Sequence, residues 1–353
     1  MNKLFAERFK SARIMSGLSL QTLADKIGNR ISRQALHKYE KGDSFPDSEI
    51  LGLLCEAFGV RPEFFTRESI VELGTIEFRK IAKLPSKEQS RVIEITKEFL
   101  TRYLELEELL GIQKTFSNPL DGENTITSFD QVEEYANFIR KEWKLGDDPI
   151  ANVVELLENN NIKVIEIDAE DEFDGLQTWI NGKNIPVIVL NIGRLKSSDR
   201  KRFTALHELG HLILPLNNLP EKVAEKYCHR FAAAMLLPKV SANKEIGVVR
   251  NKISLQELGM IKQKYGISIQ AIIYRAKDLN IITNSYFSNL FFLINQMGWK
   301  VLEPFEYEGK ENSNRFDQLI YRALSEEIIS MSKAASLKNQ KLAEFRSNTM
   351  IIG

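Results

Sequence analysis

Two histidines and a glutamate lie close together in the segment SDRKRFTALHELGHLIL, as His207, Glu208 and His211. Residues four apart project from the same face of a helix, so both imidazoles can bind one ion. Glu208, one position further on, lies beside that ion, where a carboxylate can accept a proton from water. Zinc lowers the pKa of bound water to roughly 7 and polarises a carbonyl. The pattern His-Glu-x-x-His is typical of metallopeptidases.

A catalytic zinc ion needs a third protein ligand and keeps its fourth position for water. The next segment, PEKVAEKYCHRFAAAMLLP, supplies four candidates, Glu221, Glu225, Cys228 and His229, and spacing alone does not choose among them. The helix expected around His207 also has an apolar face, so the alternative is a packed helix whose histidines hold no metal. Ligand type leaves manganese or iron open beside zinc.

The two segments together resemble the ImmA/IrrE family of metallopeptidases, whose second helix typically reads E-x-x-A-N-x-F-A-A-x-L-L-x-P. Matching Phe231-Ala232-Ala233 and Leu236-Leu237-Pro238 to that pattern places the family's ligand glutamate on Glu225. Cys228 and His229 stand where Ala and Asn are usual. The chain therefore departs from the family pattern at two positions, and both departures carry metal-capable side chains.

Two β-branched runs precede this region, NIKVIEID at 161–168 and IPVIVLNI at 185–192, and we expect each to form a strand. The turn signal Asn181-Gly182 lies just before the second run. A helix over DQVEEYANFIRKEW, the two strands and then the helix around His207 follow the order of the ImmA/IrrE catalytic domain. The resemblance covers about 128–240 and implies an α+β, zincin-like metallopeptidase domain with a small sheet.

That resemblance also implies a site and a mechanism. Zinc is held by His207, His211 and Glu225, and Glu208 deprotonates the water that attacks a peptide carbonyl. Family members cleave a partner repressor that carries a helix-turn-helix, and this switches on genes. The implied substrate is therefore a protein, a helix-turn-helix repressor.

The first 67 residues carry an independent signal. Four or five short amphipathic helices separated by glycines are expected there, and a compact all-α unit of this kind can hold a helix-turn-helix. Leu23 and Ala24 are expected inside the first helix of the pair, Gly28 at the start of the turn, and Ser32 as the N-cap of the second helix. The alternative is a helical domain of this fold that binds protein instead of DNA.

Outward-facing polar residues of the second helix are the candidates for DNA contact, because side chains of these types read base edges and phosphates in a major groove. They are Arg33, Gln34, His37, Lys38 and Lys41. Between Lys26 and Lys41 there are five Lys or Arg residues, and Glu40 is the acidic residue of that stretch. With its YEKG-x-x-x-P ending, the segment resembles the Cro/repressor-like (XRE) helix-turn-helix family, which implies a double-stranded DNA operator as partner.

Composition is that of a soluble protein with more than one domain. The chain has 353 residues, 43% of them hydrophobic, which suits two or three domains. Its 48 basic and 48 acidic residues cancel, so attraction to nucleic acid must come from the local basic face. Two cysteines, Cys55 and Cys228, predict no disulfide framework and a cytoplasmic location. No apolar run approaches the roughly 20 residues of a membrane span, which excludes a membrane partner.

We expect a multidomain, mainly α chain of four segments: a helix-turn-helix domain at 1–67, a helical linker at 68–115, the metallopeptidase domain at 128–240 and a helical C-terminal region at 241–353. The linker reads as two charged helices broken at Pro85-Ser86, which either connect or dimerise the protein, so a homodimer stays open. Helices on either side of Gly266 are expected to pack on the metal domain. One further helix is expected over NRFDQLIYRALSEEIISMSKAASL.

These observations predict a DNA-binding transcriptional regulator with zinc-dependent endopeptidase activity. Two alternatives are a regulator that cuts no peptide and uses the metal site for structure or sensing, and an antitoxin-like protein that binds a toxin through its C-terminal helices. Glu208 favours the enzyme, because a carboxylate there is not needed to hold metal but is needed to activate water. A fourth coordination position closed by Cys228 or His229 would favour the non-proteolytic regulator.

Overall fold

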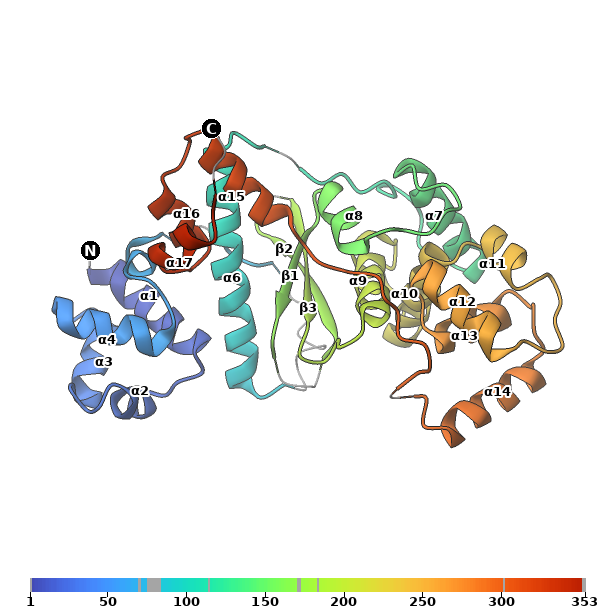
Figure 1. Ribbon diagram of the computed structural model, residues 1–353, viewed down its shortest axis with the longest axis horizontal. Helices are drawn as coiled ribbons and strands as arrows, with labels where there is room; N and C mark the ends of the chain where they lie inside the picture. Colours follow the sequence, from blue (N-terminus) through green and yellow to red (C-terminus); the bar gives the residue numbers. More distant parts are fainter. Residues whose placement is uncertain are drawn as a thin grey trace. The chain divides into compact units, whose positions relative to one another are not determined.

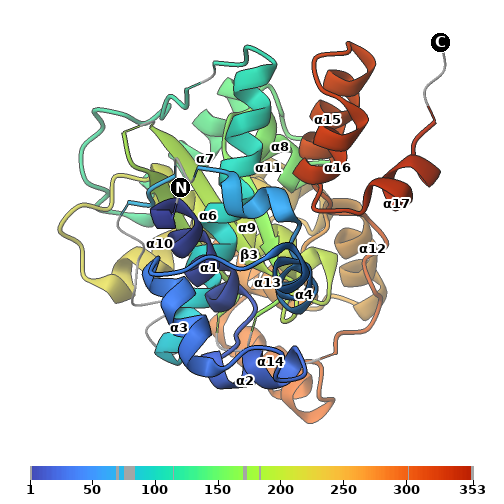
Figure 2. The ribbon, with the colours of Figure 1, turned by 90° about the vertical axis from the view of Figure 1, so that its left-hand side faces the viewer.

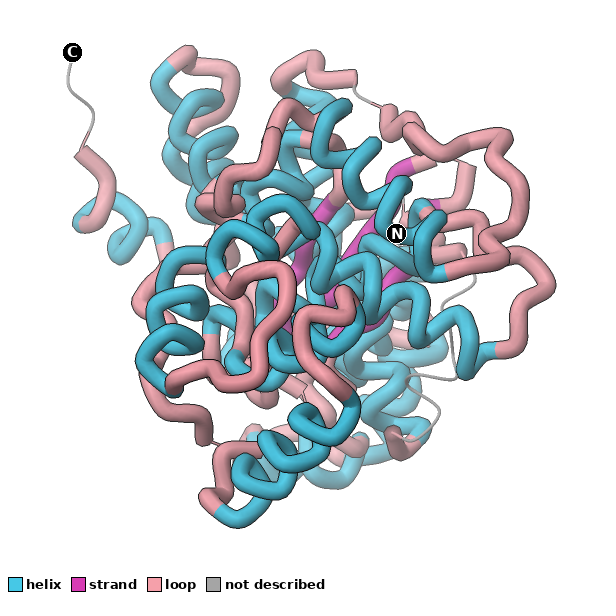
Figure 3. The backbone as a smooth tube through the Cα atoms, turned by 90° about the vertical axis from the view of Figure 1, so that its right-hand side faces the viewer, coloured by secondary structure: helices cyan, strands magenta, loops and turns pink. Residues whose placement is uncertain are grey.

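The computed structural model describes residues 2–68, 71–74, 84–113, 115–169, 173–182, 184–300 and 302–350. They form two compact units: the first contains the described residues of 1–114 and 314–350, and the second those of 115–313. Helices dominate both units, and the described strands form a three-stranded sheet in the second (Figure 3). The expected fold class, mainly α with a small sheet, is confirmed.

Short helices with well-defined ends open the first unit (Figure 2). They are α1 (Asn2–Met15), α2 (Leu20–Lys26), α3 (Arg33–Lys41), α4 (Ser48–Phe58) and the 3₁₀ helix η1 (Pro62–Thr66). The predicted N-cap is confirmed, since the Ser32 hydroxyl accepts a hydrogen bond from the backbone N–H of Ala35 (3.2 Å). α3 ends at Gly42, whose φ of +81° is in the left-handed region that favours glycine.

Helix α6 (Ser86–Leu109) also belongs to the first unit and packs against α1. Its buried Glu98 accepts hydrogen bonds from the guanidinium groups of Arg8 and Arg67, the latter at 3.2 Å. Arg8 also donates to the carbonyl of Phe64 (2.9 Å). A buried carboxylate of α6 therefore links α1, through Arg8, to the residue that follows η1, Arg67. The helix predicted before Pro85 falls on 75–83, outside the described residues.

The C-terminal helices complete this unit. They are α15 (Arg315–Ser325), α16 (Met331–Leu337) and α17 (Leu342–Ser347). The prediction of one helix over this stretch is wrong, because Glu327 has a φ of +57° and the Ser330 hydroxyl caps a new helix by accepting from the N–H of Lys333 (3.1 Å). These helices bury apolar side chains against α6, and Asn339 donates to the carbonyl of Gly59 (3.0 Å).

The sheet of the second unit has the order β1-β3-β2 (Figure 1). Strand β1 (Lys163–Ile167) runs parallel to β3 (Ile185–Asn191), and β2 (Gly175–Ile180) runs antiparallel to it. The strands predicted at 161–168 and 185–192 are confirmed. Strand β2 was not predicted; it leads into β3 through the predicted turn, where Gly182 has a φ of +73°.

The remaining described elements of the second unit are helices. They are α7 (Phe129–Glu142), α8 (Val153–Asn159), α9 (Ser198–Ile213), α10 (Glu221–Leu236), α11 (Lys239–Glu245), α12 (Leu255–Tyr265), α13 (Ile269–Asp278) and α14 (Asn284–Gln296). α9 packs on β2 and β3, and α10 packs between α9 and α7. α12 and α13, joined through Gly266, share the core of this unit, as predicted.

The C-terminal region is thus divided between the two units, with residues 241–313 in the second and 314–350 in the first. The division of the chain into the four segments 1–67, 68–115, 128–240 and 241–353 stays a prediction. Among the described residues, no helix combines the length and the apolar character that crossing a membrane requires.

Candidate metal centre and nucleic-acid interface

Helix α9 brings His207, Glu208 and His211 into the interior of the second unit. His207 and Glu208 are buried, with 7% and 2% of their surface exposed, and His211 is half-buried. The helix is held from behind by Arg202, which forms a buried ion pair with Glu311 and donates from Nε to the carbonyl of Gly266 (3.1 Å). Removing one partner of a buried ion pair leaves an uncompensated charge and is strongly destabilising. These contacts therefore hold α9 in its position.

Helix α10 lies against α9 at unusually short range. A Cβ atom added at Gly210 of α9 would lie 3.3 Å from the Cα, Cβ and Sγ atoms of Cys228 on α10. α10 is also anchored on its other side, because the buried Glu133 of α7 pairs with Arg230 of α10 and Arg275 of α13. A glycine at 210 therefore allows the close approach that carries α10 side chains to the two histidines.

Three side chains from these helices converge, through two imidazole nitrogens and the two oxygens of one carboxylate. The Nε2 atoms of His207 and His211 lie 3.2 Å apart. The Glu225 carboxylate reaches both, with Oε2 3.1 Å from His207 Nε2 and Oε1 3.2 Å from His211 Nε2. Hydrogen bonds from His207 and then His211 hold the pKa of the Glu225 carboxyl far below its usual range, although partial burial opposes this. The carboxylate is therefore ionised beside two imidazoles.

This donor set fits a zinc ion. Tetrahedral zinc with ligand distances of about 2.0–2.1 Å requires donor atoms about 3.3–3.4 Å apart, close to the spacings seen here. Imidazole nitrogen and carboxylate oxygen are both zinc ligands. The other ring nitrogen of His207, Nδ1, is buried and makes no hydrogen bond among the described residues, so this ring is oriented by its contacts at Nε2 and by the neighbouring rings of His211 and His229. Among the described residues, His207, His211 and Glu225 are thus able to hold the metal.

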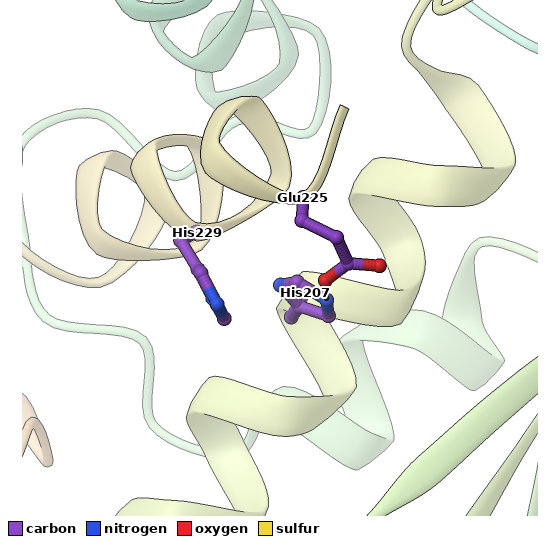
Figure 4. A group of neighbouring side chains, drawn as sticks. All are labelled: His207, Glu225 and His229. Carbon is purple, nitrogen blue, oxygen red and sulfur yellow. Dashed lines mark ion pairs between the residues drawn. The ribbon is translucent and has the colours of Figure 1, made fainter. Parts of the chain in front are cut away.

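The remaining third-ligand candidates lie elsewhere on α10. Glu221 is its exposed first residue, and the buried Cys228 faces Gly210. His229 is exposed, and its ring centroid lies 4.4 Å from that of His207. One donor atom each of His207, Glu225 and His229 lie within 4.8 Å of one another (Figure 4). His211 makes shorter contacts to this cluster than His229 does, so we take His211 as the nearer ligand.

Glu208 faces the sheet. A Cβ atom added at Gly175, the first residue of β2, would lie 2.9 Å from Thr204 Cγ2 and 3.3 Å from Glu208 Cγ. Gly175 therefore leaves room for the Glu208 side chain between α9 and the edge strand β2. Gly175 and Gly210 were not among the predicted site residues. A glycine inside a helix costs about 1 kcal/mol relative to alanine, so Gly210 did signal a close packing contact.

The second candidate site is the outer face of α3. The opposite face of this helix, with Leu36 and Tyr39, is buried, and Arg13 of α1 pairs with Glu40 (2.7 Å). The five predicted DNA-contacting side chains are all exposed, namely those of Arg33, Gln34, His37, Lys38 and Lys41. A basic, solvent-facing helix that begins at a capped N-terminus is suited to a major groove. Lys26 lies apart from this face, since its Nζ donates to the carbonyl of Ala57 (2.7 Å).

Comparison with known families identifies both regions. Residues 9–65 match the helix-turn-helix family, and residues 157–277 match the IrrE N-terminal-like domain family. The chain joins a helix-turn-helix domain to an IrrE-like domain. The expected fusion is therefore confirmed. The IrrE-like match contains α9, α10 and the convergent donor atoms, and it runs through α12 and α13.

A curated relative is the SPbeta prophage-derived uncharacterized HTH-type transcriptional regulator YonR of Bacillus subtilis (strain 168), with 39% identity over 64 residues. The match covers 18% of this chain and 57% of that protein. The chain thus spans little more than half the length of this relative. The helix-turn-helix domain implies DNA binding, and the IrrE-like domain has the fold of a metallopeptidase family that is generally zinc-dependent.

Proposed function

We propose that the protein is a DNA-binding transcriptional regulator whose IrrE-like domain is a zinc-dependent endopeptidase. The observation that carries the proposal is the convergence of two imidazole Nε2 atoms and the Glu225 carboxylate at 3.1–3.2 Å. The buried Glu208 lies on α9, the helix that carries both histidines. Packing alone does not explain why two imidazoles and a carboxylate, one of them buried and two half-buried, lie together between two helices.

His207, His211 and Glu225 are the proposed zinc ligands. Zinc bound there would supply a Lewis acid that polarises a peptide carbonyl and makes water a nucleophile near neutral pH. Glu208 is the proposed general base: its carboxylate takes a proton from the attacking water and returns it to the leaving amine. Because Glu208 is buried between α9 and β2, its carboxylate is shielded from bulk water. A proton that it takes from the attacking water is therefore kept from exchanging with solvent.

The helix-turn-helix domain is proposed to bring this activity to an operator. Arg33, Gln34 and His37 lie nearest the N-terminus of α3, which is the end that enters a major groove in this class of domain, and Lys38 and Lys41 follow. A protein substrate, a repressor that itself carries a helix-turn-helix, is the proposed target. Its cleavage would relieve repression at the same genes.

Metal content and cleavage, measured together, test the proposal. Wild type is expected to hold about one zinc per chain by elemental mass spectrometry. Incubated with a peptide library and scored for new amino termini, it is expected to cut, and a chelator should stop it. Glu208→Gln should keep its zinc and lose cleavage by roughly 10²–10⁴-fold, the usual contribution of a general base.

Glu221→Gln is the matched control, because Glu221 is an exposed glutamate on the neighbouring helix. It is expected to bind zinc and cut like wild type. Full cleavage by Glu208→Gln would remove Glu208 from the mechanism. A wild-type protein that takes up no zinc would remove the peptidase altogether and leave a DNA-binding regulator.

A further inference from the structure

Helices α9 and α10 each present a pair of metal-capable side chains four residues apart. His207 and His211 form the pair on α9, and Glu225 and His229 form the pair on α10. Residues four apart share a helix face, and the two helices pack directly on one another. Metal sites between facing helices are built from such side chains. The interface therefore offers four protein ligands, one more than a catalytic zinc site uses.

His229 lies at the outer side of this group. Glu225 and His229 project from α10 toward His207 (Figure 4), and the rings of His207 and His229 are tilted by 36°. The three-atom group containing His229 spans up to 4.8 Å, so its ring must move by up to about 1.5 Å to reach tetrahedral spacing. Since His229 is exposed whereas His207 is buried, a change of the His229 rotamer is the smaller movement that would bring the two side chains to one ion.

We propose that His229 is a fourth protein ligand that closes this metal centre on its solvent side. The inference rests on the proposed function, because it takes zinc held by His207, His211 and Glu225 as given. Catalytic zinc sites keep the fourth position open, and structural sites fill it with protein. A permanently closed position would make the site structural, so the proposed peptidase requires that His229 be displaceable: the centre is latent at rest, and a peptide reaches the metal only by displacing His229. The exposed position of His229 is where such a peptide would arrive.

Cobalt(II) in place of zinc gives a direct readout of the fourth position, with azide as a small competing ligand. In wild type the visible spectrum of the cobalt protein is expected to stay unchanged when azide is added, because all four positions are filled by protein. His229→Asn, similar in size and polarity, should open the site, so azide should shift its spectrum. Its zinc affinity, measured by competition with a chelator, should fall at least about tenfold, as even loss of an outer-sphere partner costs 10–100-fold.

Lys226→Ala is the matched control, because Lys226 is also exposed on α10 and carries no metal ligand. It should behave like wild type in both measurements. If azide shifts the wild-type spectrum and His229→Asn binds zinc as tightly as wild type, the site is open and the inference is overturned while the proposed peptidase stands. If wild type binds neither zinc nor cobalt, the proposed function fails and the inference fails with it.

Discussion

Replacing Gly210 by alanine tests whether the close contact between α9 and α10 sets the metal centre. The added Cβ atom would lie 3.3 Å from three atoms of Cys228. Carbon atoms pack best at about 3.5–4.0 Å, so the two helices must separate by a few tenths of an ångström. The separation acts directly on the site, because Glu225 lies on α10 one turn before Cys228, and its ligand partners lie on α9.

Two effects oppose each other in the stability of this variant. Alanine is favoured over glycine in a helix by about 0.8–1.0 kcal/mol. Overpacking a tight core contact costs about 1–3 kcal/mol. The free energy of unfolding of the second unit should therefore fall by about 0–2 kcal/mol. Metal affinity should respond more strongly, because metal–ligand distances tolerate only about ±0.2 Å. We expect zinc affinity to fall at least about tenfold, or 1.4 kcal/mol.

Zinc competition with a chromogenic chelator and urea unfolding of the metal-free protein measure the two quantities. Gly52→Ala is the control, because Gly52 lies in α4 with open space where its Cβ would be. That variant should gain up to about 1 kcal/mol and bind zinc like wild type. If Gly210→Ala is stabilised to the same extent and keeps wild-type zinc affinity, the argument that Gly210 sets the distance between the helices is refuted.

Three further predictions follow from the structure. Ser32→Ala removes the N-cap of α3 and should lower the free energy of unfolding of the first unit by about 1 kcal/mol in urea; an unchanged midpoint would contradict the cap. Glu133→Gln should cost about 3–5 kcal/mol at pH 7, because it leaves the fully buried Arg275 without the carboxylate that it pairs with, while Arg230 keeps its ion pair with Asp278 (3.0 Å). Burial opposes the charge of Glu133, but Arg275 and Arg230 outweigh it and hold its pKa below the usual 4.5, so this stabilisation is present above about pH 4.5 and is lost as pH falls through the lower folded-state pKa. A gap between wild type and Glu133→Gln that stays constant from pH 7 to about pH 3 would contradict that assignment. Lys38→Ala should weaken operator binding and reduce the slope of log affinity against log salt by about 1, and an unchanged slope would show that Lys38 contacts no phosphate.

Local patterns were enough to predict the elements that carry the site. The spacing of His207 and His211 predicted the helix, β-branched runs predicted β1 and β3, and Ser32 marked the start of α3. Each of these signals depends on a few neighbouring residues, so each could be recognised without knowledge of the tertiary packing. Glu225 could be predicted as the third ligand only from the resemblance to the ImmA/IrrE family. Glu221, Glu225 and His229 lie four residues apart, so spacing alone does not distinguish them.

Features that depend on tertiary packing could not be predicted from the sequence. β2 was missed because Gln177 and Thr178 are both buried, so the strand shows no alternation between an apolar and a polar face. The break between α15 and α16 depends on Glu327 adopting a left-handed conformation that no sequence pattern requires. The closeness of His229 to His207 depends on how two helices pack, which Gly210 permits but does not specify.

The helices that complete the DNA-binding unit are far from it in sequence, and this has a consequence for biosynthesis. Ribosomes release a chain from its amino terminus, so α1–α4 and α6 emerge before the second unit, and α15–α17 emerge after it. Until then the apolar face of α6, with Tyr103 and Leu106, lacks the side chains that bury it. A chain interrupted before residue 314 would therefore present exposed apolar surface to chaperones and proteases, so incomplete copies are the ones most readily removed before they reach DNA.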